Sequence, residues 1–160
     1  MNDPYIVKWG DTHFKLAWFE PGEIPADATV TTAHGYCFSD DGLLVVENHR
    51  GFELPGGHLD PGENYETAFI REVFEEACVR INGVRLLGYI RVESLHIVTK
   101  YPGESFMAFC AANVHVIEPY VVRHECLSRA FIDPFDIRQV HHHWHDIYEP
   151  SLRSAIAQYR

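Results

Sequence analysis

The sequence predicts an α/β fold in which strands surround one central amphipathic helix. Two observations support this class. Residues 64–77 contain no glycine or proline, and their apolar side chains recur at the i, i+3, i+4, i+7 spacing of a buried helical face. These side chains are Ile70, Val73, Phe74 and Ala77. On both sides of this segment, short runs rich in β-branched and aromatic residues are separated by turn residues, which is typical of strands.

Two hairpins are predicted before the helix. Residues 6–19 form the first, turning at Gly10 and Asp11, and a proline-containing loop follows over 20–27. Residues 31–38 and 43–47 form the second, because an Asp-Gly turn separates them.

Strands and two further helices are predicted after the helix. The expected strands cover 85–93, 95–100, 105–117 and 126–132. Asp133 and Pro134 are typical of a helix start, so a short helix follows them. A closing helix over 150–159 is expected to bury Leu152, Ala155, Ile156 and Tyr159.

Length and composition favour one domain over residues 1–160, with residues 1–25 as an N-terminal hairpin extension. No signal peptide or apolar run of transmembrane length is found, and the four cysteines lack metal or disulfide spacing. We therefore expect a cytoplasmic protein without membrane partners. The net charge of −10 disfavours polymeric nucleic acid as a partner, because no stripe of Lys and Arg is available to follow its phosphates.

Acidic residues occupy the central helix at fixed offsets. Glu72, Glu75 and Glu76 stand at i, i+3 and i+4, so they share a face roughly opposite the apolar one. Arg71 precedes Glu75 by four residues, close enough to pair with it. Three converging carboxylates repel one another unless a cation lies between them, and such oxygen ligands favour Mg²⁺ or Mn²⁺ over zinc.

An ordinary solvated acidic face is the simpler alternative, since charge runs on helices usually have that role. It does not account for Glu63 and Arg71 at their offsets. Nor does it account for Gly56 and Gly57, whose lack of side chains lets the backbone approach closely enough for a carbonyl to join the ligands.

Residues 57–79 resemble the signature motif of the Nudix hydrolase family, G-x5-E-x7-R-E-U-x-E-E-x-G-U, in which U is aliphatic. Every fixed position matches except one, where Cys78 replaces the last glycine. The resemblance implies an α/β/α sandwich with a mixed β-sheet, preceded here by the N-terminal β-hairpin. Because cysteine adopts a left-handed cap only with strain, we expect the helix to continue to about Arg80 and to end at Asn82 and Gly83.

The resemblance also implies a reaction, the metal-dependent hydrolysis of a phosphoanhydride in a nucleoside diphosphate linked to another moiety. It implies that Mg²⁺ or Mn²⁺ binds Glu72, Glu75, Glu76 and the carbonyl of Gly57. Arg71 and Glu63 are expected to pair and hold the helix and its loop in place.

Other positions are left as candidates. The general base is expected to be a glutamate of the motif, such as Glu75 or Glu76, or an acid from a later segment, Glu93 or Glu104. His58, in the loop of the motif, is a candidate for substrate contact.

The substrate is less constrained. Sequence markers of the ADP-ribose, dinucleoside-polyphosphate, NADH and coenzyme A groups are absent, which leaves nucleoside triphosphates, including oxidised ones. A nucleotide-sugar or ADP-ribose pyrophosphatase is the alternative within the family. A non-catalytic domain that binds nucleotides or proteins is the alternative from another class, and a homodimer is left open.

A run of histidines is the second feature. His141 and His145 stand at i, i+4, a spacing that binds zinc or nickel on a helix, but no Cys or acid is placed to complete such a site. A solvated segment anchored by Trp144 is the simpler interpretation. A segment that lines the substrate cleft is the other.

Overall fold

The computed structural model describes residues 5–95 and 103–159. Its strands are β1 Tyr5–Trp9, β2 Thr12–Phe19, β3 Val30–Ser39, β4 Gly42–Asn48, β5 Gly51–Glu53, β6 Gly56–His58, β7 Val79–Ser94, β8 Glu104–Ile117 and β9 Ser128–Ile132. Its helices are α1 Tyr65–Ala77, α2 Ile137–Val140 and α3 Glu149–Tyr159, with the short 3-10 turns η1 Pro134–Asp136 and η2 Asp146–Tyr148.

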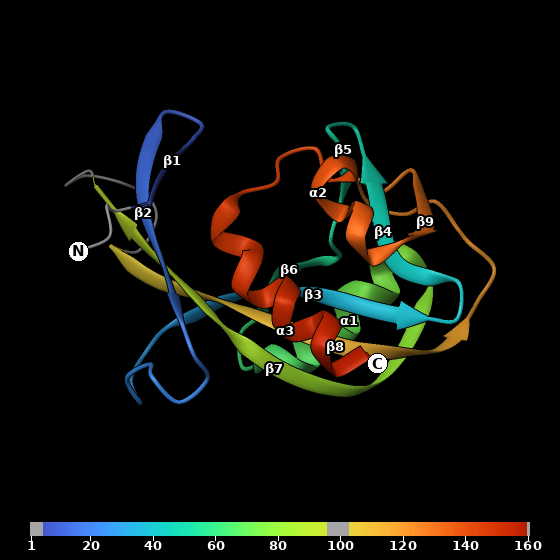
Figure 1. Ribbon diagram of the computed structural model, residues 1–160, viewed down its shortest axis with the longest axis horizontal. Coiled ribbons are helices and arrows are strands. Elements are labelled where there is room, and N and C mark those ends of the chain that lie inside the picture. The colour runs from blue at the N-terminus through green and yellow to red at the C-terminus, as the bar shows by residue number, and fades with distance from the viewer. Residues whose placement is uncertain (1–4, 96–102, 160) are drawn as a thin grey trace.

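One mixed sheet forms the centre of the molecule (Figure 1). Its main path runs β1-β2-β7-β8-β3-β4-β5, while β6 pairs with β3 and β9 pairs with β4. The central β3–β8 pair is parallel and the other pairs are antiparallel. The predicted mixed sheet is therefore confirmed.

Alternation along the strands divides the core into two apolar layers. In β4, Leu43 and Val45 join the layer that contains Leu152 of α3. Leu44 and Val46 join the layer beneath α1. Both sides of the sheet are thus covered by helices, which confirms the α/β/α sandwich (Figure 1).

The predicted N-terminal hairpin is present and extends the sheet at one edge. β1 and β2 pair with each other, and β2 continues onto β7 from Phe14↔Ser94 to Phe19↔Tyr89. The predicted hairpin of β3 and β4 and the start of η1 at Asp133 are also found.

Helix α1 begins where the sequence indicated, with the Asn64 side chain accepting from the backbone N–H of Thr67. Its buried face is rotated from the predicted one. Phe69 is fully buried, whereas Ile70 is 39% exposed, because the larger ring at the preceding position fills the contact with the sheet. Val73 and Ala77 are buried as predicted.

The predicted continuation of the helix to Arg80 is wrong. α1 ends at Ala77, and Cys78 itself adopts the left-handed conformation, with φ 55° and ψ 38°. Its backbone N–H donates to the carbonyl of Phe74, and its thiol contacts the backbone N–H (3.5 Å) and carbonyl (3.8 Å) of Val121. These contacts and the burial of the sulfur offset the strain of this cap.

Strand β7 explains why the helix must stop so early. It begins at Val79, which pairs with Ile117 of β8, six residues before the strand predicted at 85–93. Asn82 and Gly83 do not end a helix but lie at a register shift of this strand, where Gly83 takes a φ of 63°.

The remaining differences are smaller. Most of the strand predicted at 95–100 lies outside the described residues. In α3, Leu152 and Ala155 are buried as predicted, while Tyr159 is 43% exposed and stacks on Phe38. No helix in the described part of the chain is long and apolar enough to cross a membrane.

Candidate functional site

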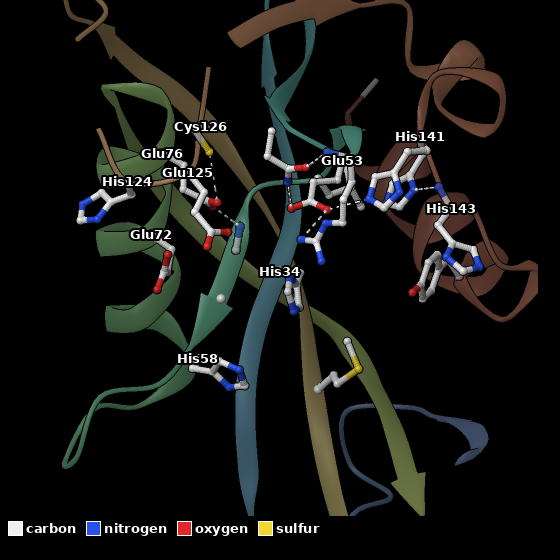
Figure 2. A pocket seen from close by; sticks show the side chains of 18 of the residues that line it. His34, Glu53, His58, Glu72, Glu76, His124, Glu125, Cys126, His141 and His143 are labelled. Carbon is white, nitrogen blue, oxygen red and sulfur yellow. Dashed lines mark hydrogen bonds and ion pairs between the residues drawn. The ribbon is translucent and has the colours of Figure 1, made fainter. Parts of the chain in front are cut away.

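A cavity of about 730 Å³ lies between helix α1 and the segment that follows α2. Glutamates of α1 form one wall of this cavity, and histidines of the later segment face them (Figure 2). Strand β6 and residues of β3, β5 and β8 lie between the two walls. The motif of residues 57–79 and the histidine run, far apart in sequence, therefore line the same cavity.

Arg71 and Glu63 form a two-pronged ion pair at the base of the acidic wall. The Arg71 Nε donates to Glu63 Oε2 at 2.9 Å, and Nη2 donates to Oε1 at 2.8 Å. The backbone N–H of Asp60 also donates to Glu63, at 2.7 Å. These donors hold the pKa of Glu63 down at about 2, with the Arg71 hydrogen bonds as the largest cause. The expected pairing of Arg71 and Glu63 is present.

The same guanidinium holds two of the predicted metal ligands. Its Nη1 donates to Glu72 at 3.0 Å and to Glu75 at 3.1 Å, while Nη2 also donates to the carbonyl of His58 at 3.0 Å. These acceptors raise the pKa of Arg71, Glu63 being the largest cause. Arg71 therefore serves as the counterion of the acidic wall and ties α1 to the loop before it.

Glu76 is held apart from the other two acids. Its Oε1 accepts from the backbone N–H of Gly56 at 2.8 Å, and its Oε2 lies 3.6 Å from the Cys126 thiol, which donates to it. Burial, with a contribution from the charge of Glu72, raises the pKa of Glu76 to about 7. Among the described residues, no cation pairs with this carboxylate as Arg71 pairs with Glu63.

Gly57 sits directly against the carboxylate of Glu72. A Cβ at this position would lie 2.7–2.9 Å from the Glu72 carboxylate atoms, so any other residue would displace the acid. The two predicted ligand positions are thus adjacent, and a side chain at position 57 would make the flexible end of Glu72 move. His58 follows on β6 and also lines the cavity, with an exposed side chain.

Glu93 and Glu104 are placed elsewhere. They lie opposite each other at the ends of β7 and β8, and Glu93 is 3.6 Å from Arg91. Neither lines the cavity that contains the motif glutamates.

Several lining residues were not found from the sequence. Glu53 accepts from Asn48 at 2.8 Å and contacts His142 at 2.9 Å, so this carboxylate ties β5 to the histidine segment. His34 lies in the cavity between the two walls, where burial lowers its pKa to about 4 (Figure 2). Trp9 reaches the cavity from the N-terminal hairpin. Of these residues, only Glu53 could have been found from the sequence, because it stands two residues before the Pro-Gly turn that enters the motif.

In the described part of the chain, no three His, Cys, Asp or Glu side chains converge closely enough to be a ready metal site. Hydrogen bonds explain why the three motif glutamates do not converge on one point. Glu72 and Glu75 are turned onto Arg71, and Glu76 is turned onto Gly56. The donor set is nevertheless of the type that hard divalent cations prefer, since it consists of carboxylates beside a backbone strand.

Comparisons with known proteins agree with the motif. A sequence model of the NUDIX domain matches residues 28–154. Over 55 residues the chain is 40% identical to the Bacillus subtilis (strain 168) protein YtkD, whose name suggests an 8-oxo-dGTP diphosphatase. That match covers 34% of this chain and 35% of YtkD, so it spans about a third of the relative's length.

Two solved structures share the fold. The Bacillus subtilis pyrophosphohydrolase BsRppH has a TM-score of 0.62 at 20% identity, over 89% of this chain and 80% of that one. A NUDIX hydrolase from Nitrosomonas europaea has a TM-score of 0.60 at 23% identity, over 82% of this chain and 91% of that one. At such identities the likeness concerns the fold alone.

Proposed function

Because this chain belongs to the NUDIX domain family, we propose that it hydrolyses a phosphoanhydride bond in a nucleoside diphosphate linked to another moiety. Nucleoside triphosphates, including oxidised ones, are the substrates to test first, since the partial relative YtkD carries an 8-oxo-dGTP diphosphatase name. The observation that carries the proposal is the set of motif glutamates on one wall of a cavity large enough for a nucleotide.

A divalent cation, Mg²⁺ or Mn²⁺, fits the residues of this wall. The carboxylates of Glu63, Glu72 and Glu75 share the Arg71 guanidinium, and Glu76 lies apart from it, so negative charge is in excess among the described side chains of this wall. Glu72, Glu75, Glu76 and the carbonyl of Gly57 would hold the ion. When bound, it would supply positive charge to the phosphate oxygens and activate a water for attack on phosphorus.

The chain's own residues contribute binding and orientation. Arg71 fixes the positions of Glu72 and Glu75, while the backbone of β6 fixes Glu76. Of the candidate general bases, Glu75 and Glu76 line the cavity and Glu93 and Glu104 do not. We therefore place the base among the motif glutamates.

The test compares turnover of wild type and Glu76→Gln in the presence of Mg²⁺. The substrates are nucleoside triphosphates, 8-oxo-dGTP, ADP-ribose and nucleotide sugars, and released phosphate or pyrophosphate is measured. Wild type should hydrolyse at least one of them, and Glu76→Gln should lower turnover by on the order of 10²-fold or more. The unfolding midpoint should hold or rise, because burial disfavours the charge that the substitution removes.

Glu66→Gln is the matched control, since Glu66 is an exposed acid on the first turn of the same helix and does not line the cavity. It should keep wild-type turnover. Hydrolysis of ADP-ribose or nucleotide sugars alone would select the alternative within the family. If no substrate is turned over while nucleotide still binds to Glu76→Gln, the protein is a binding module instead.

A further inference from the structure

The wall of the cavity opposite α1 consists mostly of flat rings. We call it the ring wall, and its members are Trp9, His141, His142, His143, His145 and Tyr148. Figure 2 shows His141 and His143 on the side of the cavity away from Glu72 and Glu76. The hydrolysis proposed above uses none of these residues.

The N-terminal hairpin builds part of this wall. The Trp9 ring packs 5.3 Å from Phe14 and 6.4 Å from His145, measured between ring centroids. The Tyr5 hydroxyl accepts from the backbone N–H of Asp146 at 3.1 Å and lies 3.5 Å from Nδ1 of His145. Both hairpin residues precede residue 28, where the match to the family begins. Trp9 therefore reaches the ring wall from outside the matched segment, whereas the other members of the wall lie within it.

Burial disfavours the charged form of two histidines of the ring wall. Burial lowers the pKa of His141 to about 4, helped by the neighbouring histidines, and burial also lowers the pKa of His145. Arg50, which also lines the cavity, lies 3.9 Å from Glu53, which offsets its charge. A surface of flat rings suits a planar group that stacks.

We propose that the ring wall binds the nucleobase of the substrate and that Trp9 stacks on it, which makes the N-terminal hairpin a specificity element. The inference rests on the proposed function, because the phosphates then lie at the glutamates of α1. The cavity of about 730 Å³ falls in the range that accommodates ligands of nucleotide size.

The first experiment tests base binding without hydrolysis. Trp9 becomes the sole tryptophan in the variant Trp18→Phe/Trp144→Phe, because the chain has three tryptophans and the other two do not line the cavity. dGMP should quench its fluorescence saturably, whereas deoxyribose 5-phosphate, which has no base, should leave it unchanged. An equal response to the two ligands, or no response to dGMP, would overturn the proposal.

The second experiment uses the hydrolysed nucleoside triphosphate. Trp9→Leu should raise its KM on the order of tenfold or more, the loss expected for one stacked base, with kcat within about twofold of wild type. The Ki of inorganic tripolyphosphate as a competing inhibitor should not change, since it has no base. Trp18→Phe, on the same hairpin but outside the cavity, should keep the wild-type KM.

The two experiments separate the failure of each proposal. An unchanged KM in Trp9→Leu, or an equal rise in the Ki of tripolyphosphate, contradicts a role in base binding. If no nucleotide is hydrolysed at all, the proposed function fails, and the fluorescence titration still decides whether the ring wall binds a base.

Discussion

At the scale of single residues, Arg71 is the side chain on which the acidic wall depends. Its guanidinium donates to Glu63, Glu72 and Glu75 and lies 3.4 Å from Asp60. The side chain is 25% exposed, so these ion pairs are partly shielded from water. A bidentate pair of this kind depends on the planar fork of arginine, which lysine lacks.

We expect Arg71→Lys to lower the free energy of unfolding by about 1–2 kcal/mol, because one ammonium cannot replace the paired hydrogen bonds to Glu63. Urea unfolding at pH 7 measures the effect. A double-mutant cycle with Glu63→Gln should show that most of the loss is shared between the two residues.

Arg80→Lys is the control for this prediction. Arg80 pairs with Glu118 at 2.8 Å, but the two side chains are 55% and 35% exposed, so its replacement should change stability by well under about 1 kcal/mol. An equal loss of unfolding free energy in Arg71→Lys and Arg80→Lys would show that the two hydrogen bonds from Arg71 to Glu63 have no special role.

Cys78 makes a second prediction at this scale. We expect Cys78→Gly to be more stable than Cys78→Ala by about 1 kcal/mol, because both lose the sulfur but only glycine is relaxed at a φ of 55°. Urea unfolding of the two variants at one pH measures the difference.

Cys37 is the control for this prediction, because it is buried in β3 and does not have a positive φ. At that position we expect the alanine variant to be more stable than the glycine variant. An alanine variant at position 78 that matches or exceeds the glycine variant in stability would show that the cap is not strained.

Arg71 and Cys78 show which contacts of single residues could be predicted from the sequence and which could not. The Arg71–Glu63 pair could be predicted, because both residues occupy fixed positions of the motif. The cap at Cys78 depends on Val121, far along the chain, and on the strand that begins at Val79. No local pattern contains that information, which is why the helix end was misplaced.

At the scale of elements, the segment from His141 to Tyr148 links the parts of the cavity. His141 pairs with Phe52 of β5, and the backbone N–H of His142 donates to the carbonyl of Phe52 at 2.8 Å. Nδ1 of His141 accepts from the backbone N–H of His143 at 3.0 Å. The His141 ring is half-buried among Trp144, Tyr148 and its histidine neighbours, so its charged form is disfavoured.

This burial predicts acid sensitivity. The pKa of His141 is about 4 in the folded protein and near 6.5 when unfolded, so the unfolded state binds the proton first as pH falls. The contribution of His141 to stability should be constant above pH 6.5 and should decline between pH 6.5 and 4. We expect His141→Asn, whose amide oxygen can replace the acceptor at Nδ1, to remove about 2 kcal/mol of that decline.

Urea unfolding of wild type and His141→Asn at pH 8, 7 and 4.5 tests this expectation. The difference between the two proteins should be the same at pH 8 and 7 and should shift in favour of the variant at pH 4.5. A difference that does not vary with pH would mean that the His141 ring takes up its proton as readily in the fold as outside it.

Elements with local signals were predicted well. The two hairpins have turn residues between alternating runs, and α3 shows an apolar stripe. The extension of β7 back to Val79 was not predicted, because it exists only through pairing with residues 113–117 of β8. The exposed Ile70 also depends on tertiary packing, since the neighbouring Phe69 is the residue that packs into the layer against the sheet.

At the scale of the whole molecule, the sheet separates two apolar layers, and residues of the central β3–β8 pair line the cavity (Figure 2). The α/β/α sandwich could be predicted, because the motif resembles that of a family with this fold. The acidic wall could be predicted for the same reason, since its glutamates belong to the motif. The ring wall draws on positions 9, 141–143, 145 and 148, which no spacing rule connects.

The contact between Tyr5 and Asp146 has a consequence for how the protein is made. It joins residues 141 positions apart, so it cannot form until nearly the whole intervening chain has left the ribosome. The contacts between the acidic helix and its loop join residues no more than 20 positions apart, so they need a much shorter stretch of the emerging chain. We therefore expect contacts of the acidic wall to form before the ring wall is complete, and the finished cavity to be among the last parts of the molecule to assemble.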